Sequence, residues 1–163
     1  LPEAQFFSRS DWDLALKKGD TVLDMHIPRA DRFRMEDCQD SLRQAYQFFS
    51  RYYPERPFKA CFCHTWFFSP QLQQIAPLES NIVRFQREFY LFPFAGKVAF
   101  LWFYVFGEGV KERASAPDNT TLQRSVLSWL ANGGEIFDLP GVMFHGPDEW
   151  GTHPYMRSFE ASA

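Results

Sequence analysis

The segment FKACFCHTWFF, residues 58–68, decides the fold class, because it is apolar on both faces of an extended chain. In a strand, Cys61 and Cys63 point to one side and His64 points to the other. A strand with two apolar faces is typical of the interior of a sheet that is covered on both sides. We therefore expect residues 58–68 to form a central strand, in which His64 has either a chemical or a structural role.

The segments on either side predict a mixed sheet flanked by helices. Apolar residues recur at spacings of three and four in two segments, which predicts helices there. Proline, glycine and capping-box signals mark the ends of the elements. We expect helices at 35–53 and 120–133 and a short helix after Ser69. Extended segments are expected around 12–28, divided by a turn at 17–20, and a turn or short helix followed by a strand over 80–94. After a turn at 95–97, we expect a strand at 98–106 paired antiparallel with 88–94, and then a short strand at 135–144.

These elements predict one domain over residues 1–163, of the α/β (α+β) class, with a partly antiparallel central sheet. The net charge is −3, with 17 basic and 20 acidic residues, which argues against a nucleic-acid partner. The longest apolar run, Val98–Phe106, is too short to span a membrane. Three cysteines, an odd number, argue against a disulfide framework and favour a reducing, cytoplasmic compartment.

The cysteines give little support for a metal site or for a thiol nucleophile. With Cys38, Cys61 and Cys63 as the only thiols, a four-thiolate zinc site cannot be built, and we predict no metal. Cys63 and His64 are adjacent, so in a strand they point to opposite faces and cannot form a nucleophile–base pair.

Histidines provide the candidate acid–base groups. A neutral imidazole at His64 could accept a proton from an attacking amine, whereas the structural alternative is a buried histidine with an internal partner. His26 lies two residues after Asp24, so both side chains share one face of a strand, and a carboxylate can orient an imidazole for base catalysis. The alternative is a solvated polar face. In the loop after residue 144, His145 and His153 are expected to be exposed.

A second candidate site combines amide and guanidinium groups in one short segment. Arginine binds carboxylates and phosphates through paired hydrogen bonds, so this segment could hold an anionic group. The alternative is a structural network that ties the segment to a helix end. We further expect His64 and Arg84 to line one cleft, and the tail to dock through Trp150 and Tyr155. The residues of the candidate segment are Asn81, Arg84, Gln86 and Arg87.

Several strings, taken in order, resemble one protein family: VLDMHIP, EDCQDSLRQAYQFF, CHTWFFSPQL, SNIVRFQREFYLFP and NTTLQRSVLSWLANGG. Together they are similar to the GNAT-like C-terminal domain of bacterial two-domain acyltransferases, over residues 12–134. The resemblance implies acetyl-CoA or another acyl-CoA as cofactor, a small-molecule amine as acceptor, and an N-terminal domain of a longer parent chain as partner. It places His64 and Trp66 in the string CHTW, with His64 as the catalytic residue and Trp66 in substrate binding. His26 and the amide and guanidinium segment are the other expected substrate contacts.

One departure from the wider superfamily keeps two functional hypotheses open. N-acetyltransferases hold the pyrophosphate of coenzyme A at a helix start that carries Arg/Gln-x-x-Gly-x-Gly/Ala. No glycine of this chain lies in that pattern, and the nearest pair is in FGEGVKER, residues 106–113. The chain is therefore expected to be either an acyl-CoA-dependent N-acyltransferase domain or a non-catalytic GNAT-like module that packs on its partner domain.

Overall fold

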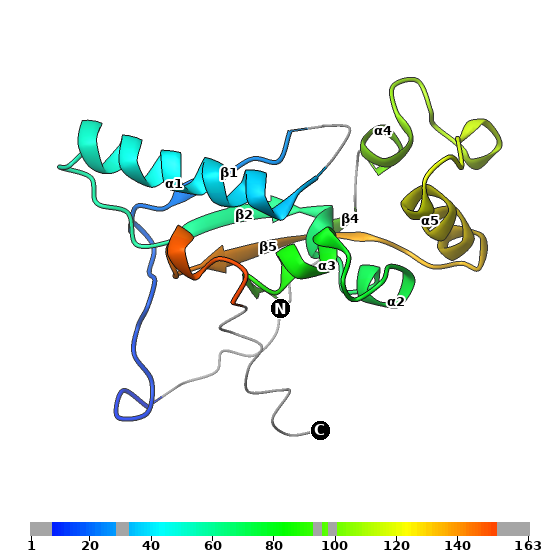
Figure 1. Ribbon diagram of the computed structural model, residues 1–163. Coiled ribbons are helices and arrows are strands. Elements are labelled where there is room, and N and C mark those ends of the chain that lie inside the picture. Colours follow the sequence, from blue (N-terminus) through cyan, green and yellow to red (C-terminus); the bar gives the residue numbers. More distant parts are fainter. Residues whose placement is uncertain (1–7, 29–32, 93–95, 98–100, 153–163) are drawn as a thin grey trace.

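The computed structural model describes residues 8–28, 33–92, 96–97 and 101–152 (Figure 1). Its strands and helices form a mixed α/β domain. The strands are β1 (Leu23–Met25), β2 (Cys61–Thr65), β3 (Tyr90–Leu91), β4 (Gly96–Lys97) and β5 (Phe137–Met143). The helices are α1 (Met35–Tyr52), α2 (Leu72–Ile75), α3 (Asn81–Gln86), α4 (Leu101–Phe106) and α5 (Thr121–Ala131), with short 3-10 turns at Trp66–Phe68, Arg113–Ser115 and Pro147–Glu149.

The sheet has the strand order β1-β2-β5-β3, and β4 pairs with the other end of β5. β1 and β2 are parallel, and α1 connects them, as a crossover between parallel strands requires. β5 runs antiparallel to both β2 and β3. The predicted mixed, partly antiparallel α/β sheet is confirmed, and so is the interior position of residues 61–65.

Helix α1 begins and ends where its sequence predicts. Glu36 and Asp37 lie in its first turn, where the helix dipole favours acidic side chains, and Arg51 lies in its last turn. Met35 and Leu42 are buried on its sheet-facing side. The helix ends just before Pro54, which cannot continue it.

The segment 98–106 was expected to be a strand, and that prediction is wrong. Leu101–Phe106 is helix α4, while residues 98–100 lie outside the described part of the chain. Burial follows a helical period, because Leu101 and Phe106 are buried while Phe103 and Tyr104 are exposed. A short apolar run fits either structure, and here contacts with α5 decide, since Gln123 of α5 donates a hydrogen bond to the Val105 carbonyl.

Strand β5 takes the place that the sequence assigned to residues 98–106. β3 pairs with β5, and Gly96 and Lys97, expected to turn the chain, pair with β5 as β4. Pro140 lies inside β5 and has no N–H to donate. Its carbonyl accepts from the N–H of Phe92, just beyond the short β3, so the missing N–H falls at the place where the pairing with β3 ends. The first predicted extended segment, residues 12–16, forms no strand in the described chain.

Two apolar clusters hold these elements together. The first joins α1, α3 and the sheet, and includes Leu42, Cys61, Phe85 and Met143. The second lies beyond one end of the sheet, where α2, α4 and α5 pack around Val126 (Figure 1). None of the helices in the described ranges has the length and apolar character needed to cross a bilayer.

The segment after β5 docks onto α1. Trp150 is buried, and its indole donates a hydrogen bond to the Met35 carbonyl at 3.0 Å. Docking of the tail through Trp150 is thereby confirmed, whereas Tyr155 and His153 lie outside the described residues. His145, expected to be exposed, is buried instead, and its imidazole contacts the buried carboxylate of Glu88.

The two faces of the sheet differ. α1 and α3 pack on the face that carries Cys61 and Cys63. Alternate residues point to the other face, which we call the open face because many of its side chains are exposed. The residues of the open face are Asp24, His26, Phe62, His64, Tyr90, Asp138, Pro140 and Val142, of which Val142 is buried.

Candidate functional site

The two histidines predicted from sequence lie on the same open face. In the parallel register of β1 and β2, Asp24 pairs with Phe62 and Met25 pairs with Cys63. One step further along this register, His26 comes beside His64. Both histidines are exposed, so the structure makes them accessible to a substrate and does not bury either in the core.

Each of these histidines has a carboxylate on its own side. The Nε2 atom of His26 lies 3.2 Å from Oδ2 of Asp24, and the two side chains are 87% and 58% exposed. His64 is opposite Pro140, so Asp138, two residues away on β5, is its diagonal neighbour. Burial raises the pKa of Asp138, and His64 partly offsets that rise. The result is a row of aspartate, histidine, histidine and aspartate across three strands.

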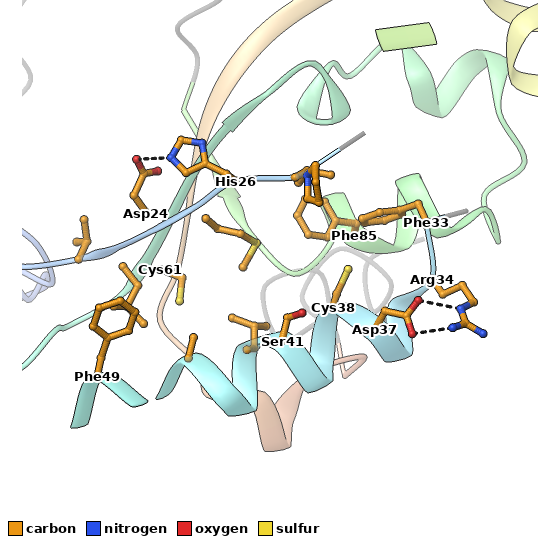
Figure 2. A pocket seen from close by; sticks show the side chains of 17 residues that line it. Asp24, His26, Phe33, Arg34, Asp37, Cys38, Ser41, Phe49, Cys61 and Phe85 are labelled. Carbon is orange, nitrogen blue, oxygen red and sulfur yellow. Dashed lines mark hydrogen bonds and ion pairs between the residues drawn. The ribbon is translucent and has the colours of Figure 1, made fainter. Parts of the chain in front are cut away.

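An apolar groove of about 540 Å³ runs between β1 and α1 (Figure 2). Its floor includes the buried residues Leu42, Cys61 and Phe85. Cys38 and Ser41 point from α1 toward the strand, while the Asp24–His26 pair stands on the outer side of β1. The groove therefore borders β1, and His26, the histidine with a carboxylate oxygen at 3.2 Å, directly follows this strand.

The thiols near the groove are poor nucleophiles. Burial raises the pKa of Cys38 and of Cys61 to about 11, and that of Cys63 to about 12. At neutral pH these groups are protonated, and the thiolate is the reactive form. Among the described residues no cluster of histidine, cysteine and carboxylate side chains has a geometry suited to a metal ion.

Three of the residues assigned to substrate binding make structural contacts within the chain. Trp66 is buried in the cluster around Val126. Asn81 donates a hydrogen bond to the Phe33 carbonyl at 2.8 Å, which fixes the start of α1 against α3. Gln86 donates to the carbonyls of Phe67 and Ser69 at 2.6 and 2.9 Å and accepts from Gln73. These contacts match the structural network that the sequence left as the alternative.

Replacing Gln86 with leucine is expected to lower the free energy of unfolding by about 1–3 kcal/mol, because two buried carbonyls lose their donor. Thermal unfolding measures this change, and Gln74→Leu, at an exposed glutamine of α2, is the matched control. An unchanged unfolding temperature for Gln86→Leu would contradict the structural role.

The predicted cleft shared by His64 and Arg84 is wrong. Arg84 belongs to α3, which packs on the face of Cys61, whereas His64 points to the open face. The reason is the connection, because β2 and β3 are parallel but β5 lies between them. Arg84 and Arg87 are half-buried, and within the described chain neither guanidinium has a hydrogen bond or ion pair.

Sequence reasoning missed Asp138 and the groove. Asp138 sits in a segment read only as a short strand, and its neighbour His64 is more than 70 residues away in the chain. The available signal for the groove was a row of small residues, Cys38, Ser41 and Ala45, at helical spacing beside the apolar face.

Comparison with known proteins identifies a family and several similar structures that match most of the chain. The model of a family described as the GNAT-like C-terminal domain matches residues 3–143. An acyltransferase structure in complex with decanoyl-CoA is similar to this chain with a TM-score of 0.67 and 27% identity. An acyltransferase in complex with decanoyl-CoA and teicoplanin gives a TM-score of 0.69 at 24% identity. An acyltransferase mutant with octanoyl-CoA gives 0.69 at 23%.

These alignments cover 80% of this chain but only 42–43% of the acyltransferase chains. The chain thus spans less than half the length of these structures. The comparison with curated proteins gave no match.

Proposed function

Because the chain belongs to the family of GNAT-like C-terminal domains, we propose that it serves an acyl-CoA-dependent N-acyltransferase. The observation that carries this proposal is the Asp24–His26 pair on the strand that borders the apolar groove. An acyl transfer needs a proton acceptor next to a place for an apolar acyl group, and this arrangement offers both. The acyl-CoA bound in the similar structure with 27% identity supports the same reading.

Acyl-CoA supplies an acyl group activated as a thioester. When an amine attacks the thioester carbonyl, a new C–N bond forms, the C–S bond breaks, and one amine proton must be removed. His26 is the best placed acceptor, because Asp24 at 3.2 Å orients its ring and stabilises the imidazolium that forms. The proton finally reaches the thiolate sulfur of the departing coenzyme A. His64, beside His26 in the register, remains the base predicted from the sequence and is a second candidate.

The chain offers a better place for the acyl group of acyl-CoA than for its pyrophosphate. The groove suits an apolar acyl group. Arg84 and Arg87, whose guanidinium groups have no hydrogen bond or ion pair among the described residues, are suited to an anionic group. The glycine motif that cradles a pyrophosphate is missing from the sequence. We infer that the N-terminal partner region contributes to holding the phosphates.

The second candidate function is a non-catalytic module that packs on its partner domain. The missing glycine motif favours it, and so do the exposed aromatic side chains of Tyr90 and Phe92 near the open face. The two functions differ in one respect, because only the first requires binding of acyl-CoA and release of free thiol.

We expect saturable binding of decanoyl-CoA in a calorimetric titration, and release of free coenzyme A once an amine acceptor is added. A thiol-reactive chromophore measures the release, and the full-length protein is the sample. Absence of both binding heat at millimolar ligand and thiol release would reject the enzyme proposal and leave the packing module.

A further inference from the structure

We propose that the groove between β1 and α1 binds the acyl chain itself, and that the aromatic side chains at its two ends limit the length of the chain that it accepts. This inference rests on the proposed function, because it assigns a place to the apolar part of the acyl donor. It makes α1 and β1 of this chain, and not only its partner region, responsible for acyl-chain specificity.

The groove has the size and lining of a small-molecule site. Its volume of about 540 Å³ lies within the range of about 300–1,000 Å³ that is usual for ligand pockets. Leu23 and Met25 of β1, with Ile27 just after it, line one wall, and α1 lines the other. These apolar side chains pack against the main cluster, so the groove is continuous with the core.

Helix α1 creates the space through small side chains. Cys38, Ser41 and Ala45 are spaced by three and four residues, so they lie on one side of the helix, and all three line the groove. Aromatic rings close the two ends, with Phe49 at one end and Phe33 and Phe85 at the other (Figure 2). A groove of limited length, closed by aromatic rings at both ends, is suited to a linear acyl chain.

The polar groups of the groove lie at its rims. Arg34 and Asp37 form an exposed ion pair at one rim, with Nε 2.8 Å from Oδ2, and Asp24 and His26 form the other pair. An acyl donor has the same division, with an apolar chain and a polar thioester end. The buried thiol of Cys61, whose pKa is raised to about 11, would lie beside the chain without attacking the thioester.

This assignment predicts how affinity depends on chain length. Burial of each methylene group is expected to raise the affinity about fourfold until the groove is full. From acetyl-CoA to decanoyl-CoA the affinity should therefore rise steeply. For acyl chains too long to fit between the aromatic rings at the two ends of the groove, the affinity should level off or fall.

Ser41→Phe is the test, because Ser41 lines the groove and is exposed, so the larger ring can enter the groove without disturbing the core. We expect Ser41→Phe to weaken decanoyl-CoA binding at least about tenfold while acetyl-CoA binding is unchanged, as measured by calorimetry on the full-length protein. Ser50→Phe is the matched control, since Ser50 is exposed on the same helix and does not line the groove.

The outcomes separate this inference from the proposed function. Selective loss of long-chain binding in Ser41→Phe, with wild-type affinity in Ser50→Phe, supports the acyl groove. If Ser41→Phe binds decanoyl-CoA as tightly as the wild type, the groove assignment is overturned while acyl-CoA binding stands. If the wild type binds no acyl-CoA of any length, the proposed function itself fails and the groove assignment fails with it.

Discussion

Replacing His26 with alanine is expected to lower kcat for acyl transfer about 10²- to 10⁴-fold, which is the usual contribution of a general base. The reason is geometric, because His26 is the open-face histidine that has a carboxylate within 3.2 Å. Both side chains are largely exposed, so the loss of the imidazole removes the proton acceptor without creating a cavity in the core. The affinity for decanoyl-CoA should change little, since His26 lies at the polar rim of the groove and the apolar side chains that would hold the acyl chain are unchanged.

Two further variants distinguish catalysis by His26 from a general effect on the open face. Asp24→Asn should lower kcat less than His26→Ala, because the imidazole remains and only its orientation and charge partner are weakened. His64→Ala tests the residue that the sequence favoured, which has Asp138 as its diagonal neighbour. If His64→Ala abolishes turnover while His26→Ala leaves it intact, His64 is the base and our assignment of His26 is wrong.

The sequence predicted the elements whose signals are local. Helix α1 follows from a long apolar period and Pro54, and the interior strand follows from two apolar faces around Cys61. It could not distinguish strand from helix at Leu101–Phe106, where six apolar and aromatic residues fit both. Contact with α5, distant in the sequence, decides the outcome.

In the candidate site too, contacts between residues close in the sequence could be predicted, whereas contacts between distant segments could not. Asp24 and His26 are two residues apart on one strand, so their proximity could be predicted. Their position beside His64 depends on the register of β1 against β2, and the neighbour Asp138 depends on the pairing of β2 with β5. Neither pairing has a local signal, because strand register is fixed by packing across the whole sheet.

Replacing Glu88 with alanine is expected to lower the free energy of unfolding by about 3–5 kcal/mol, the usual result of removing one partner from a buried ion pair. Oε2 of Glu88 lies 2.9 Å from Nε2 of His145, and their side chains are 0% and 4% exposed. The pair joins the end of the α3 segment to the segment after β5. That segment is also held by Tyr46, which donates to the His145 carbonyl, and by the hydrogen bond of Trp150.

A loss of this size is a large part of the roughly 5–15 kcal/mol that stabilises a typical domain. It should lower the melting temperature by about 10 °C or more, as measured by circular dichroism. Glu55→Ala, at an exposed glutamate, is the control and should shift the melting temperature by only about 1–2 °C. If Glu88→Ala melts at the temperature of that control, the pair does not stabilise the fold. A double variant, Glu88→Leu with His145→Leu, should recover part of the loss, because neither polar group of the pair then remains buried against an apolar replacement of the other.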